Sequence, residues 1–169
     1  MQVMHGDGSP AATSRIDPGI AREGFTMGLY LTISLLAVLT AKSGDGDDGA
    51  VLTLIWGTTL GLALAHWLAF QLAARLFVGS TLTSHDRLAI LAQAAAAVAV
   101  ASLASLPLLL GASAATALSR GVLAGLIGLF GYAAVRSNGG SRTRAAGYGL
   151  AVVVVAVVVA AGKYLLAGH

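Results

Sequence analysis

The stretch LAVVVVAVVVAAG, at positions 150–162, decides the fold class, because every side chain in it is apolar and most are β-branched. Valine-rich runs of this kind also form buried strands. This run contains no turn signal, and it belongs to a longer apolar segment, about 145–166, that can cross a hydrocarbon core of ~30 Å as a helix. In lipid, a single segment satisfies its own backbone hydrogen bonds only as a helix. The stretch therefore predicts a transmembrane helix.

Four further apolar segments precede this one, and short polar or glycine-containing stretches separate them. Each is near or above the ~20 residues that a helix needs to cross the membrane. We therefore predict an all-α fold, a polytopic membrane helix bundle with about five transmembrane helices. A polar cytoplasmic lead over residues 1–24 precedes a single transmembrane domain over residues 25–169, with helices at about 25–41, 50–78, 87–110, 117–135 and 145–166.

The first apolar segment has a second interpretation as a cleaved signal peptide, because Arg15 and Arg22 precede it. The candidate cleavage site has Leu39 where signal peptidases need a small residue, and the polar lead is long. We therefore favour a retained helix.

The composition excludes several classes of protein. Hydrophobic residues make up 57% of the chain and charged residues 10%, against about 25% charged in soluble domains. The absence of cysteine excludes disulfides, thiolate metal sites and thiol redox chemistry. The net charge of +3 is spread over several loops, so we expect no nucleic-acid partner. The lipid bilayer is the expected environment.

The distribution of basic residues orients the bundle through the positive-inside rule. An odd number of spans places the two ends of the chain on opposite sides of the membrane. With the N-terminus inside, the inner segments hold seven basic residues and the outer segments hold three. The inner ones are Arg15, Arg22, Arg75, Arg87, Arg136, Arg142 and Arg144, and the outer ones are Lys42, Arg120 and Lys163. We predict a multi-pass protein of the bacterial inner membrane with its N-terminus in the cytoplasm and its C-terminus outside.

Small residues mark the expected helix contacts. The fourth predicted helix carries Gly121, Gly125, Gly128 and Gly131, and the first two have the small-xxx-small spacing that lets helix backbones approach closely in lipid. This contact can lie within one bundle or between copies of the chain. Because five short helices enclose little volume, a permeation path would lie more easily on a symmetry axis, and we expect a homo-oligomer.

One polar pair lies near the middle of the second predicted helix. His66 and Thr59 share a helix face two turns apart. Histidine titrates near physiological pH, so His66 suits a proton relay or a pH-gated pore. The alternative is a neutral histidine that bonds a neighbouring hydroxyl or carbonyl and holds two helices together. A metal site is disfavoured because no second histidine lies at helical spacing, and we expect no metal and no cofactor.

Five more polar side chains are candidates for a polar path. Gln71 projects from a different face of the second helix, and Gln93 lies on a small-residue stripe of the third, where hydrogen bonding to the next helix is the favoured interpretation. Glu23, Tyr30 and Ser34 fall on one stripe of the first helix. This stripe would line a cavity with Glu23 at its cytoplasmic mouth, unless Glu23 only stabilises the N-terminus of the helix.

Several motifs are missing from the sequence. No aspartate or glutamate lies inside a predicted hydrophobic core, which argues against a proton- or sodium-coupled carrier. No G-x-S-x-G, H-E-x-x-H or Walker motif is present, and the acidic residues between the first two helices are best interpreted as solvated charge. We therefore expect no enzymatic activity.

The strings GLYLTI (positions 28–33) and ALAHWLAF (positions 63–70), with an acidic loop between them, resemble a pattern in small multi-span membrane proteins of actinobacteria. Those proteins are uncharacterised, and the resemblance covers the first two helices only. It implies that Tyr30 and His66 belong to a recurring helix pair, and it implies no activity or substrate.

These observations lead to two hypotheses about function. The first is a small channel or passive transport protein, pH-responsive through His66. The second is a non-catalytic accessory or structural membrane protein that binds a larger partner through its glycine- and alanine-rich helix faces. The permeant ion or small molecule is not specified by the sequence.

Overall fold

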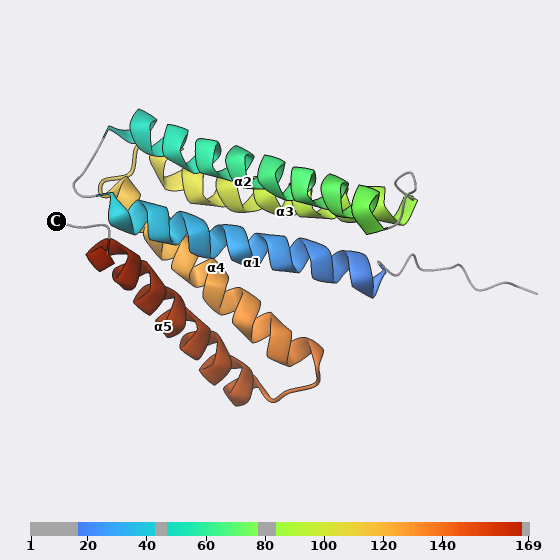
Figure 1. Cartoon of the computed structure of the whole chain (residues 1–169). Helices are drawn as coiled ribbons and strands as arrows, with labels where there is room; N and C mark the ends of the chain where they lie inside the picture. Colours follow the sequence, from blue (N-terminus) through green and yellow to red (C-terminus); the bar gives the residue numbers. More distant parts are fainter. Residues whose placement is uncertain (1–16, 43–46, 78–83, 167–169) are drawn as a thin grey trace, which may run out of the picture.

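The computed structural model of the chain describes residues 17–42, 47–77 and 84–166. They form five helices, each long and apolar enough to cross a membrane, which confirms the all-α membrane fold (Figure 1). The helices are α1 (Pro18–Ala41), α2 (Asp48–Phe77), α3 (Ser84–Leu109), α4 (Ala115–Ser137) and α5 (Arg142–Leu166). Residues 1–16 of the predicted polar lead lie outside the described residues. The other predicted helix boundaries agree with the structure to within three residues, except at the start of α1.

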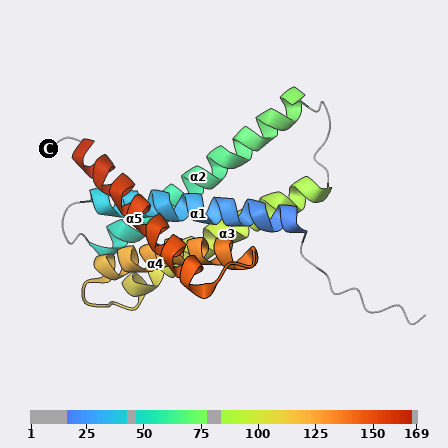
Figure 2. The ribbon, with the colours of Figure 1, turned by 90° about the horizontal axis from the view of Figure 1, so that it is seen from below.

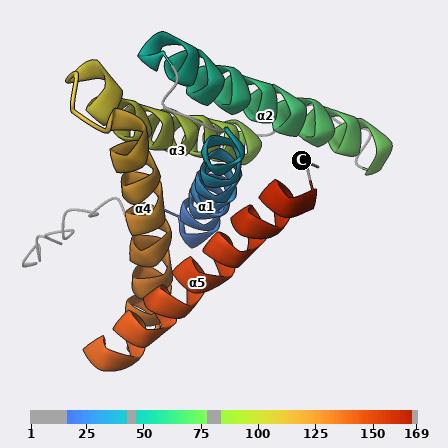
Figure 3. The same ribbon diagram turned by 90° about the vertical axis from the view of Figure 1, so that its left-hand side faces the viewer.

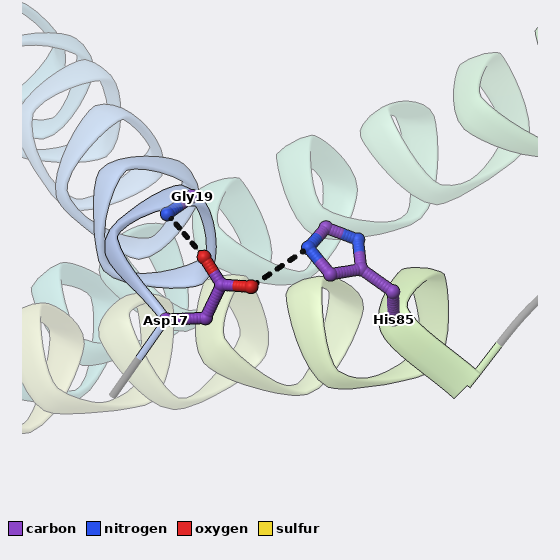
Figure 4. A network of polar contacts seen from close by, with 3 residues as sticks. All are labelled: Asp17, Gly19 and His85. Carbon is purple, nitrogen blue, oxygen red and sulfur yellow. Dashed lines mark hydrogen bonds and ion pairs between the residues drawn. The ribbon is translucent and has the colours of Figure 1, made fainter. Parts of the chain in front are cut away.

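The first helix begins seven residues earlier than the sequence suggested, at Pro18 instead of residue 25. The Asp17 carboxylate accepts a hydrogen bond of 2.8 Å from the backbone N–H of Gly19, and Pro18 occupies the first helical position. Both features favour the start of a helix. The N-cap side chain bonds a backbone N–H that has no partner within the helix, and proline at the first position has no N–H that would need one. The same carboxylate lies 3.5 Å from Nε2 of His85 in the first turn of α3 (Figure 4). A proline and a glycine that suggested a turn are therefore the first residues of α1.

The first helix lies in the middle of the bundle. It contacts each of the other four helices, and 44% of its apolar span is buried, against 17% for α2 and α5. Figure 3 shows α1 nearly end-on, with the other four helices around it. Among the described residues, α2 and α5 make no contact with each other. One side of α1 is therefore left uncovered between them.

The largest buried side chains gather at the end of the bundle where α1 finishes. Fully buried side chains come from the last turns of α1, the first turns of α2 and α4 and the last turns of α3. They include Leu31, Leu35, Leu39, Val51, Ile55, Ser105, Ser119, Leu123 and Ile127. We call this half of the molecule the closed half.

The second helix leaves the bundle after the closed half. Val51, Ile55 and Thr59 are buried, whereas no described side chain of α2 beyond Thr59 is. Figure 2 shows the later turns of α2 inclined away from α1. The helix has 30 residues, or about 45 Å at 1.5 Å per residue, so it exceeds the thickness of the hydrocarbon core, as the sequence predicted.

A single arginine, Arg120, joins two helices in the closed half. Nε of Arg120 donates to the carbonyl oxygen of Leu39 at 2.9 Å, and its Nη2 donates to that of Lys42 at 3.1 Å. These carbonyls lie at the C-terminus of α1, where they lack helical partners and carry partial negative charge. The sequence suggested that Arg120 extends to the lipid headgroups. It instead joins the start of α4 to the end of α1.

Glycines let α4 and α5 approach closely. The glycines at this contact are not Gly121 and Gly125, the pair with the predicted small-xxx-small spacing. A Cβ atom at Gly131 would lie 2.9 Å from Cα of Gly149, and one at Gly149 would lie 2.7 Å from the carbonyl oxygen of Gly128. By contrast, a Cβ atom at Gly121 or Gly125 would meet no described atom within 4 Å. The glycines that pack are therefore the later two of the four, against a glycine of α5 that the sequence did not single out.

Candidate functional site

A cavity of about 230 Å³ lies between α1, α2 and α3, beside the part of α2 that leaves the bundle. It exists because α2 inclines away from its neighbours after Thr59, so the facing side chains no longer interdigitate. Its walls are almost entirely apolar and include two aromatic rings. The lining residues are Met27, Leu60, Ala63, Leu64, His66, Trp67, Phe70, Ile90, Gln93 and Ala94.

A hydrogen bond between two polar side chains lies at the edge of this cavity. Nε2 of Gln93 donates to a carboxylate oxygen of Glu23 at 2.9 Å, which is the contact between helices that the sequence favoured for Gln93. Gln93 is only 6% exposed. A carboxylate only accepts hydrogen bonds, so the amide nitrogen must face it. Among the described residues, none is shown bonded to the amide oxygen of Gln93.

The two polar groups that line the cavity, His66 and Gln93, lie at similar depths. His66 follows the midpoint of α2 by three to four residues and Gln93 precedes the midpoint of α3 by as many, which is about 5 Å at 1.5 Å per residue. The two helices run in opposite directions, so both displacements point to the end of the bundle where α1 begins. Glu23 lies about 10 Å from the midpoint of α1 towards the same end. Because α1 begins at Pro18, Glu23 lies in the second turn of a helix that is long enough to span the membrane.

The predicted pair of Thr59 and His66 is divided between two environments. Thr59 is 3% exposed, and its hydroxyl donates to the carbonyl oxygen of Ile55 at 2.7 Å. His66 is exposed and lines the cavity. Its ring has no hydrogen-bond partner among the described residues, so the structure contains no bond of the kind expected for a purely structural histidine. Thr59 belongs to the closed half, and His66 belongs to the cavity.

The remaining candidates do not line the cavity. Tyr30 is 55% exposed, Ser34 is partly buried, and both share the stripe of Glu23. Gln71 is partly buried and does not line the cavity. The structure thus groups His66, Gln93 and Glu23, and it leaves Tyr30, Ser34 and Gln71 outside this group.

Two features of the site were missed from the sequence. The aromatic wall of Trp67 and Phe70 was not predicted, although Phe70 lies one turn after His66 on the same helix face. The link between Glu23 and Gln93 joins residues 70 positions apart, and no local pattern indicates it. Within the described ranges, no group of three or more histidine, aspartate or glutamate side chains could hold a metal ion.

No protein-family model, curated protein or solved structure matches the chain. The resemblance of its first two helices to actinobacterial membrane proteins therefore stays a prediction.

Proposed function

We propose that the protein is a small passive transport protein of the bacterial inner membrane, and that the cavity between α1, α2 and α3 forms part of its path. The observation that carries this proposal is a cavity lined by His66 of α2 and Gln93 of α3, with Glu23 of α1 hydrogen-bonded to Gln93. Polar side chains at membrane depth are costly, so such a group favours a functional role over packing alone. This cavity lies in one half of the bundle, and the other half is closed.

The proposed orientation places the cavity towards the cytoplasm. With the N-terminus inside, the end where α1 begins faces the cytoplasm, and the closed half with Arg120 faces outward. A solute in the cavity would then be separated from the outside by Leu35, Leu39 and the Arg120 contacts. Passage requires movement in this half or a path between copies of the chain.

Single cysteines at Asp48 and at Ser141, labelled in intact cells, test the orientation, because only the first should react with an impermeant reagent.

His66 is the proposed source of a pH response. Its ring lines the cavity, and protonation would place a positive charge on a mostly apolar wall. Solute passage should therefore differ between a mildly acidic and a mildly alkaline pH.

The test is flux into proteoliposomes that hold the purified protein, with dyes for protons and potassium and with small organic solutes. We expect flux that depends on pH and loses this dependence in His66→Ala. The matched control is His85→Ala, because His85 lies at the end of the bundle beside Asp17 and outside the cavity. Absence of flux for every solute at both pH values would contradict the proposal.

A second candidate function is that of a non-catalytic accessory protein, and one observation favours it. Gly57, Gly61, Gly121 and Gly125 have no described atom within 4 Å of an added Cβ, so two small-xxx-small pairs leave room for the close approach of another helix. These pairs suit a second copy of the chain or a larger membrane partner. Purification from native membranes distinguishes the two, since the accessory role predicts a stoichiometric partner and the transport role predicts a homo-oligomer.

A further inference from the structure

We propose that the cavity binds an amphipathic organic cation, a protonated amine attached to a small aromatic or aliphatic body. This inference names the solute class of the transport site and rests on the proposed function for the statement that the solute is carried. Binding itself requires only the cavity. Three properties of the site lead to it: its charge, its hydrogen-bonding groups and the shape and chemistry of its walls.

The acidic group nearest the cavity is Glu23, which does not line it but bonds the lining residue Gln93, whereas the lining residue His66 is uncharged when deprotonated. The carboxylate of Glu23 is held by the neutral amide of Gln93, and among the described residues no arginine, lysine or histidine forms an ion pair with it. A carboxylate near the apolar part of a membrane is stabilised by an opposite charge. A ligand with an ammonium group would supply that charge. An anionic ligand would be repelled.

The hydrogen-bonding groups match a donor. The carboxylate of Glu23 and the amide oxygen of Gln93 are both acceptors, and none of the described residues is shown bonded to the amide oxygen. An alkylammonium carries up to three N–H donors and no acceptor, as the lysine side chain does. It can therefore donate a hydrogen bond to each oxygen, and it has no acceptor group that would be left without a partner.

The walls fit the apolar body of such a molecule. Trp67 and Phe70 present aromatic rings, which attract cations through their faces and bury apolar surface efficiently. A cavity of about 150 Å³ is known to hold benzene, so the 230 Å³ found here has room for a ring with a short chain. An inorganic cation fits poorly, because the lining provides few oxygen ligands.

The experiment compares three probes of the same size that differ in charge: 2-phenylethylammonium, 2-phenylethanol and phenylacetate. The protein is held in nanodiscs without any gradient, and binding is followed by the fluorescence of Trp67 in a Trp56→Phe background. We expect a saturable change with the ammonium probe, at a concentration roughly tenfold lower than with the alcohol. Phenylacetate should give no saturable change. The reciprocal Trp67→Phe variant, which reports from Trp56, should stay unchanged with all three.

The variant that tests the charge is Glu23→Gln, with Asp48→Asn at the opposite end of the bundle as the matched control. Glu23→Gln should bind the ammonium probe and the alcohol equally, while Asp48→Asn keeps the tenfold preference. A second variant, Ala94→Leu, fills the cavity and should weaken the binding of both probes. Each variant is first checked for an unchanged thermal unfolding midpoint in detergent.

The outcomes separate the two proposals. Equal binding of the ammonium probe and the alcohol by the original protein, or a preference that survives Glu23→Gln, would overturn the inference about the ligand. Flux of other solutes would then leave the proposed function intact. Selective binding of the ammonium probe without any flux would support the inference and contradict the transport role.

Discussion

The contact of α4 with α5 and the contact of α2 with α3 differ in how closely the helices approach. Gly128, Gly131 and Gly149 bring the backbones of α4 and α5 together until no Cβ atom fits between them. The facing residues of α2 and α3 include Leu60, Trp67 and Ile90, which are too large for such an approach. Side-chain size at the contact therefore distinguishes a closely packed hairpin, α4 with α5, from a looser pair, α2 with α3, that borders a cavity open at the surface.

The same comparison shows that glycine spacing alone does not identify a packed face. Gly121 and Gly125 have the small-xxx-small spacing, yet an added Cβ at either would meet no described atom within 4 Å. Gly128 and Gly131 are three residues apart and pack tightly, because Gly149 of α5 lies opposite. A close approach needs small residues on both helices.

The largest expected effect is the loss of the closely packed hairpin in Gly149→Leu. A side chain there would collide with the backbone of Gly128, which cannot move aside, so we expect a loss of about 3 kcal/mol in the free energy of unfolding. The measurement is unfolding in mixed detergent micelles. Gly147→Leu, on the same helix with no atom within 4 Å, is the matched control and should change stability little. Equal losses in the two variants would show that α4 and α5 do not pack through these glycines.

The next effect concerns the contacts of Arg120 in the closed half. Arg120→Met removes two charge-assisted hydrogen bonds to the end of α1, and we expect a loss of about 1–3 kcal/mol. Arg144→Met is the control, because the exposed side chain of Arg144 makes no hydrogen bond or ion pair among the described residues. The same unfolding assay applies, and a stability equal to that of the control would mean that Arg120 does not hold α1.

Sequence reasoning gave the helices reliably and their contacts poorly. The helices follow from apolar length, which lipid converts directly into secondary structure. The early start of α1 was missed because Pro18 and Gly19 were interpreted as a break, although Asp17 makes them a start. The backbone carbonyls that Arg120 bonds lie 81 and 78 residues away in the sequence, and the partner of Gln93 lies 70 residues away. Local spacing therefore could not identify either contact. His66 was selected for its depth, and its place on a cavity wall depends on the inclination of α2.

A smaller effect on stability is expected at the cavity, where the looser pair tolerates change. Glu23→Gln keeps a hydrogen-bonding amide beside Gln93, and Glu23 is exposed, so the free energy of unfolding should change by less than about 0.5 kcal/mol. A thermal unfolding midpoint within error of the original protein would be the expected result. A large loss would instead identify Glu23 as part of the scaffold.

The smallest effect on the isolated chain is expected for Gly125→Leu, because nothing lies within 4 Å of an added Cβ. The unfolding curve in dilute detergent should be unchanged. Size-exclusion chromatography with light scattering then reports assembly, and the proposed homo-oligomer predicts a shift to smaller mass. An unchanged mass would exclude this face from the contact between copies.

The cavity is the central claim, and the natural absence of cysteine allows it to be tested directly. Ala63 lines the cavity, whereas Ala65 is exposed on the opposite face of α2. Thiols react as thiolates, which need water, so Ala63→Cys should react with a water-soluble thiol reagent in membranes about tenfold faster than Ala65→Cys. Addition of 2-phenylethylammonium should slow the first reaction and leave the second unchanged. Equal rates at the two positions, with no protection at either, would contradict the account.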